Sequence, residues 1–123
     1  PGGQQMKIAD DVFRKVKIIR ITHDPPENGC APSADYLFRS VAEHFGANAT
    51  AVIMTGMGSD GTLGLQLMKE KGAFIIAQDE VSSVVYGMAK KPVEMGIVDM
   101  VAPLDQIALQ IRRTIPRGLN MSG

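Results

Sequence analysis

The sequence predicts an α/β domain with an open, mostly parallel, Rossmann-like sheet and helices on both faces. Residues 50–54 and 74–77 are almost uniformly apolar, as is typical of strands covered on both faces of a parallel sheet. Segments with apolar residues at helical spacing alternate with these strands, an order that produces right-handed crossovers. The chain has 123 residues and is 45% hydrophobic, so it can form one core of ordinary size.

The N-terminal part of the chain predicts a strand, a loop and a helix. Residues 16–22 are rich in β-branched side chains and predict the strand, and the prolines and glycine of residues 24–32 predict the loop. Ser33 occupies the N-cap position of a helix that ends near Gly46. The apolar stripe of that helix consists of Ala34, Leu37, Phe38, Val41, Ala42 and Phe45.

The C-terminal part predicts further helices and strands. A helix begins near Thr62 and ends with Gly72 as its C-cap. Residues 84–90 predict a shorter helix that Pro92 limits, and residues 100–102 predict a last strand. The stripe of a terminal helix consists of Leu104, Ile107, Ala108, Ile111 and Ile115, and residues 116–123 are expected to form a disordered tail.

Composition and charge exclude several classes of function. Thirteen basic and thirteen acidic residues give no net charge, which argues against nucleic acid or an acidic membrane as a ligand. The single cysteine, Cys30, cannot form an intrachain disulfide, and no apolar run approaches membrane-spanning length, so a cytoplasmic setting is expected. Two histidines and one cysteine lie at unrelated spacings, so we expect neither a metal site nor a cofactor.

Residues 55–61, Thr-Gly-Met-Gly-Ser-Asp-Gly, connect a predicted strand directly to a predicted helix. Three glycines allow a tight backbone path, and Asp60 is the one carboxylate in this turn. From the residues alone, we favour a cap by Ser59 or Asp60 on the helix that follows. A second interpretation is a binding module whose turn presents backbone N–H groups to an anion such as a nucleotide phosphate, although a carboxylate in the turn opposes it.

Three blocks of sequence resemble the chemotaxis-type protein-glutamate methylesterases of the CheB family: ITHDPPENGCAPSADYLFRSVAEHFG, TGMGSDG and AQDEVSSVVYGMAKKPVEMG. The resemblance extends over residues 1–115, and it implies hydrolysis of glutamate γ-methyl esters on chemoreceptor cytoplasmic helices, with glutamine deamidation in related members. It assigns Asp60 to the aspartate of a Ser-His-Asp triad, and the backbone N–H of Met57 to the oxyanion hole.

The family's nucleophile lies in a Ser-Thr-Gly-Gly turn, and its base histidine follows another strand; neither segment occurs in these residues. His23 matches a loop histidine without a triad role, and His44 lies at the polar end of a helix. Gln5 stands where the family commonly has histidine. We assign no nucleophilic role to Cys30, Ser59, Ser82 or Ser83, and we interpret Arg112 and Arg113 as a solvated helix face.

The expectation is therefore a C-terminal portion of a methylesterase catalytic domain, inactive alone, with an incomplete sheet. Its expected partners are methylated chemoreceptor helices, the missing N-terminal half of the domain and, as in many relatives, a receiver domain. Exposed sheet edges also predict self-association.

Overall fold

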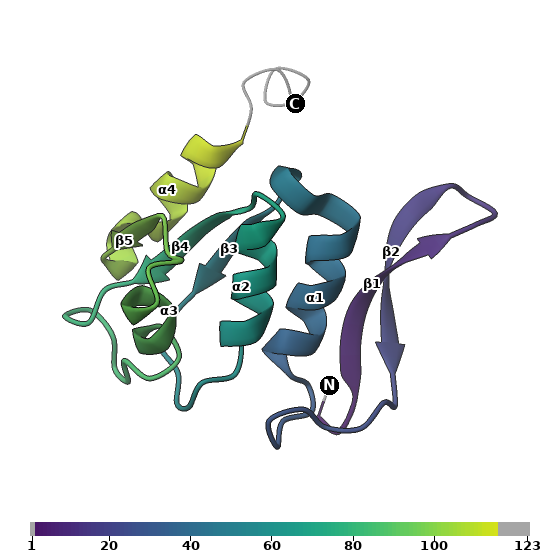
Figure 1. Cartoon of the computed structure of the whole chain (residues 1–123), viewed down its shortest axis with the longest axis horizontal. Helices are drawn as coiled ribbons and strands as arrows, with labels where there is room; N and C mark the ends of the chain where they lie inside the picture. The colour runs from purple at the N-terminus through teal and green to yellow at the C-terminus, as the bar shows by residue number, and fades with distance from the viewer. Residues whose placement is uncertain (1, 116–123) are drawn as a thin grey trace.

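A computed structural model describes residues 2–115, and it has a parallel three-stranded sheet at its centre (Figure 1). The order of the strands is β3 (Thr50–Ile53), β4 (Phe74–Gln78) and β5 (Met100–Ala102). The helices are α1 (Ala34–Phe45), α2 (Thr62–Glu70), α3 (Lys90–Glu94) and α4 (Ile107–Thr114), with short 3-10 turns at Gly46–Asn48 and Leu104–Gln106. The predicted α/β class and parallel sheet are confirmed.

The central strand β4 is covered on both faces. Ile75 and Ala77 lie in a buried cluster with residues of α1 and α2, whereas Ile76 packs with Ala102 and with Ile107 of α4. Because neighbouring residues of a strand point to opposite faces, each face needs apolar side chains, which explains the uninterrupted apolar run of β4. Helices therefore cover both faces of the sheet, as the sequence predicts.

A separate antiparallel hairpin, formed by β1 (Gln5–Asp11) and β2 (Val16–Thr22), packs against α1 through β1 (Figure 1). The backbone N–H of Ile8 donates to Ser40 Oγ on α1 at 2.8 Å. Strand β1 was not predicted, since its residues alternate only weakly and two acidic residues end it. Its register comes from pairing with β2 and packing on α1, and neither is local in sequence.

The predicted helix at residues 84–90 is wrong. Residues 84–89 are irregular, and α3 begins at Lys90. Pro92 lies inside the first turn of α3, where a missing N–H breaks no helical hydrogen bond, so this proline is compatible with the helix instead of limiting it.

The remaining boundaries lie within a few residues of the predictions. The C-cap of α2 is Lys71 and not the predicted Gly72, and the first residues of the predicted terminal helix form the 3-10 turn Leu104–Gln106 before α4. Gly46 (φ 51°) follows α1, and Gly72 (φ 93°) follows the C-cap of α2, both with backbone angles that favour glycine. The tail predicted at residues 116–123 lies outside the described residues. No helix within residues 2–115 is long and apolar enough to cross a membrane.

Candidate functional site

The 55–61 turn leaves the carboxyl end of β3 and leads into α2, as predicted, and a buried glutamine holds its start. Gln78, 1% exposed at the end of β4, accepts the backbone N–H of Thr55 at 2.9 Å and donates to the carbonyl of Ser82 at 2.9 Å. Ser82 Oγ in turn accepts the backbone N–H of Leu104 at 3.0 Å. Two polar side chains, those of Gln78 and Ser82, thus join the loops that follow β3, β4 and β5.

The irregular segment before α3, residues 84–89, holds Gly56 of the turn. Gly56 donates to the carbonyl of Val85 at 2.9 Å, and the carbonyl of Gly56 accepts N–H groups from Gly87 and Met88, each at 3.0 Å. A Cβ on Gly87 would lie 2.6 Å from the oxygen of Gly56, so only glycine allows this approach of the two backbones. These contacts also explain why residues 84–89 are not helical, because their backbone groups bond to the turn.

The backbone amides of residues 57–61 have no hydrogen-bond acceptor among the described residues. Gly58 and Gly61 have positive φ angles of 86° and 101°, which permit this open path. The side chain of Met57 is exposed, with 82% of its surface accessible. A run of unpaired N–H groups can bind an anion or a developing oxyanion.

Asp60 accepts four hydrogen bonds from the segment around the N-terminus of α1. Its Oδ1 accepts from Asn28 Nδ2 at 3.0 Å, from Ser33 Oγ at 2.7 Å and from the N–H of Asp35 at 3.3 Å. Its Oδ2 accepts from the N–H of Ala34 at 2.6 Å and from no other donor within residues 2–115. Oδ2 is therefore the oxygen that can accept a further hydrogen bond.

The prediction that Asp60 or Ser59 caps the helix that follows the turn is wrong. Helix α2 begins after Gly61 without a side-chain cap, whereas Asp60 caps α1, which precedes it in sequence. Ser33 is the N-cap residue of α1 by position, but its hydroxyl donates to Asp60 instead of capping its own helix.

The environment of Asp60 keeps its carboxyl group ionised. Burial alone would raise its pKa, but hydrogen bonds from the N–H of Ala34, the hydroxyl of Ser33, the amide of Asn28 and the N–H of Asp35 together outweigh burial. The pKa of Asp60 therefore lies below its ordinary value of 3.8. A carboxylate that is fixed and ionised in this way suits the orientation of a histidine.

The other candidate side chains, those of His23, His44, Cys30, Ser82 and Ser83, form no hydrogen bond with Asp60 within residues 2–115. His23 Nε2 lies 3.3 Å from Gln4 Nε2 at the open end of the β1–β2 hairpin, and His44 contacts Lys17 and Asp10. The hydroxyls of Ser82 and Ser83 bond to Asp79, and Cys30 contacts the carbonyl of Asn28.

Gln5 has a structural role. It is fully buried; its Oε1 accepts the N–H of Ser33 at 2.8 Å, and its Nε2 donates to the carbonyls of Pro25 and Cys30. It therefore anchors the proline-rich loop beside α1. The sequence reasoning missed this role and that of Gln78, although a lone glutamine at the end of an apolar strand is a signal that could have pointed to Gln78.

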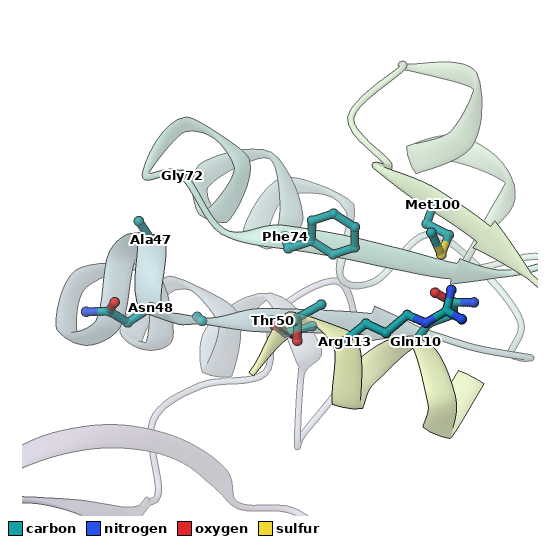
Figure 2. A pocket seen from close by; sticks show the side chains of 10 residues that line it. Ala47, Asn48, Thr50, Gly72, Phe74, Met100, Gln110 and Arg113 are labelled. Carbon is teal, nitrogen blue, oxygen red and sulfur yellow. Dashed lines mark hydrogen bonds between the residues drawn. The ribbon is translucent and has the colours of Figure 1, made fainter. Parts of the chain in front are cut away.

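A cavity of about 380 Å³, shown in Figure 2, lies where the three strands begin. The 55–61 turn follows the other, carboxyl end of β3. Thr50, Phe74 and Met100, the first residues of the three strands, line it together with Gln110 and Arg113 of α4. The described residues that line it include no histidine, cysteine or carboxylate. Its two threonine hydroxyls have no base beside them, because Thr50 donates to Thr114 and Thr114 donates to the carbonyl of Ile111, so we do not assign the chemistry to this cavity.

Comparison with known proteins gives consistent matches. Residues 1–111 match the family model described as CheB methylesterase. A protein-glutamate methylesterase/protein-glutamine glutaminase of Desulfotalea psychrophila is 56% identical over 115 residues, which are 94% of this chain and 32% of that protein. A protein of the same description, numbered 4, from Anaeromyxobacter dehalogenans is 48% identical over 113 residues, which are 92% of this chain and 31% of that protein.

The crystal structure of the Thermotoga maritima CheB methylesterase catalytic domain superposes with a TM-score of 0.88 at 30% identity. That match covers 94% of this chain and 60% of the Thermotoga chain, whereas this chain spans about a third of the length of the two curated relatives. With the family model matched over nearly the whole chain and the fold shared with a catalytic domain of that description, the chain belongs to the CheB methylesterase family.

Proposed function

We propose that this chain forms the C-terminal portion, residues 1–115, of the catalytic domain of a protein-glutamate methylesterase. In the proposed reaction a serine attacks the ester carbonyl and a histidine takes and returns the proton, both from a segment outside these residues. Asp60 orients the histidine, and the N–H of Met57 stabilises the tetrahedral oxyanion. The substrates are glutamate γ-methyl esters on chemoreceptor cytoplasmic helices in the cytoplasm, and glutamine deamidation is a related activity of the same site.

The observation that carries this proposal is the geometry of Asp60. Its carboxylate is ionised and fixed by four donors, yet its Oδ2 accepts only one of these bonds. A triad carboxylate needs these properties, because it must hold an imidazole in one orientation and stabilise its positive charge without taking the proton. The amides of residues 57–61, three residues or fewer from Asp60, support the position of the oxyanion hole.

A chimaera tests the proposal. The part of the Desulfotalea psychrophila protein that precedes the matched stretch is joined to Pro1, and methanol release from a methylated chemoreceptor is measured. We expect the chimaera to release methanol and to react with a fluorophosphonate, and this chain alone to do neither. A chimaera that is folded by circular dichroism but inactive, beside an active Desulfotalea parent, would refute the proposal.

An anion-binding module is the alternative, favoured by the unpaired amides of residues 57–61. The ionised carboxylate of Asp60 in the same turn opposes a phosphate there. Calorimetric titration with nucleotides separates the two functions, since the esterase proposal expects no heat of binding. Self-association through the β3 and β5 edges of the sheet remains a further expectation, which light scattering on the eluted protein tests.

A further inference from the structure

The two helices that meet at the 55–61 turn cap each other. Asp60, which precedes α2, accepts the N–H groups of the first two residues of α1, Ala34 and Asp35. Asp35, in the first turn of α1 and 2% exposed, accepts the N–H of Gly64 in the first turn of α2 at 2.7 Å. A carboxylate from each side therefore meets the positive end of the other helix.

The two carboxylates are joined by one side chain from a third segment. Asn28 Nδ2 donates to Asp35 Oδ2 at 2.7 Å and to Asp60 Oδ1 at 3.0 Å. An amide nitrogen has two hydrogens, so one group can satisfy both acceptors, whereas an amide oxygen in this place would repel both. The neutral amide thus lies between two negative charges and adds no competing charge.

The tight turn around Asn28 fixes the position of its side-chain amide. Asn28 (φ 54°) and Gly29 (φ 72°) form the centre of a tight turn closed by the bonds between Glu27 and Cys30, at 3.0 and 2.7 Å. Gln5 holds the carbonyl of Cys30, and Glu27 forms an ion pair with Arg39 on α1. The turn is therefore held at both ends, by Gln5 at Cys30 and by Arg39 at Glu27.

We propose that Asn28 is a positioning residue for the Asp60 carboxylate: its side-chain amide ties Asp60 to the buried Asp35 and turns Oδ2 of Asp60 toward the incoming histidine. The inference rests on the proposed function. Asn28 does not touch the reacting atoms; it fixes the rotation of a carboxylate whose other donors lie along one helix end. Without the amide, Asp60 and Asp35 retain their helix caps but lose the link that sets the angle between them.

The first arm of the test uses this chain and needs no activity. The pKa of Asp60 is followed by carboxyl ¹³C NMR in the wild type and in Asn28→Gly, which keeps the positive φ angle and removes the amide. The charged groups near Asn28 and Asp60 are Asp35, Glu27 and Arg39, and they are the same in the wild type and in the variant. We expect Asn28→Gly to raise the pKa of Asp60, and Asn28→Asp, which has the same shape but adds a charge, to raise it further. The matched control is Lys15→Gly. Within residues 2–115, Lys15 is the non-glycine residue besides Asn28 that has a positive φ angle, and its replacement should leave the pKa of Asp60 unchanged.

The second arm uses the chimaera. We expect Asn28→Gly to lower kcat about tenfold with KM within about twofold of wild type, a loss of ~1.4 kcal/mol of transition-state stabilisation. Lys15→Gly should leave both constants unchanged. A purely structural role would lower the stability of Asn28→Gly but not kcat of the folded enzyme. Wild-type kcat in both Asn28 variants, or an unchanged pKa of Asp60, overturns the inference. An inactive chimaera instead overturns the proposed function, and the first arm still decides whether Asn28 controls Asp60.

Discussion

Replacement of Asp60 by alanine removes the acceptor of four hydrogen bonds, one of them from a buried hydroxyl. Loss of a helix cap costs ~1 kcal/mol. Leaving the Ser33 hydroxyl without its acceptor adds ~1–2 kcal/mol, because this residue is buried. Asn28 is exposed, so water replaces its bond. We therefore expect Asp60→Ala to lower the free energy of unfolding by ~2–3 kcal/mol.

Urea denaturation followed by far-UV circular dichroism measures this loss, since the chain contains no tryptophan. Glu43→Ala is the matched control: it removes an exposed acid from α1, the helix that Asp60 caps, and we expect it to change the free energy of unfolding by no more than ~0.5 kcal/mol. A loss below ~1 kcal/mol for Asp60→Ala, or one equal to that of Glu43→Ala, would show that Asp60 does not hold the start of α1.

Three further results are expected. Gly87→Ala should destabilise the fold by ~1–3 kcal/mol in the same urea assay, because the new Cβ meets the oxygen of Gly56 at 2.6 Å; unchanged stability would contradict this close approach. Gln78→Met should speed hydrogen exchange of the Thr55 amide and cost ~1–3 kcal/mol, and unaltered exchange would mean that another group holds the turn. The pKa of Asp60 is lowered on folding, so its stabilising effect is complete well above pH 3.8 and is lost as the pH falls through the folded value. The difference in the free energy of unfolding between wild type and Asp60→Asn should accordingly narrow below about pH 4. A difference that widens below about pH 4 would contradict the lowered pKa of Asp60.

Local patterns in the sequence were sufficient for most of the parallel sheet and its helices. The apolar run of β4, the cap position of Ser33 and the glycine after α1 are local signals, and each appears in the structure where it was predicted, whereas Gly72 lies one residue beyond the C-cap of α2. The error at residues 84–90 has a tertiary cause, because the backbone of this segment bonds to Thr55 and Gly56 instead of forming a helix.

The candidate site was only partly accessible from the sequence. The 55–61 turn and Asp60 stood out because glycines and a carboxylate follow an apolar strand. The partners of Asp60 could not be predicted, since Asn28 and Ser33 lie about thirty residues earlier and meet it only when α1 packs on α2. The prolines and glycine of residues 24–32 predicted a loop, but not the direction of the Asn28 amide within it.

The central claim is that Asp60 orients a histidine during ester hydrolysis, and the most direct measurement is methanol release by the chimaera with and without Asp60→Asn. Asparagine keeps the shape of the side chain, so variants that remain folded by circular dichroism can be compared. The account predicts a fall in kcat of about 10⁴-fold, the loss that the same change causes in a serine protease triad. A folded Asp60→Asn chimaera that hydrolyses the ester at the wild-type rate would contradict it.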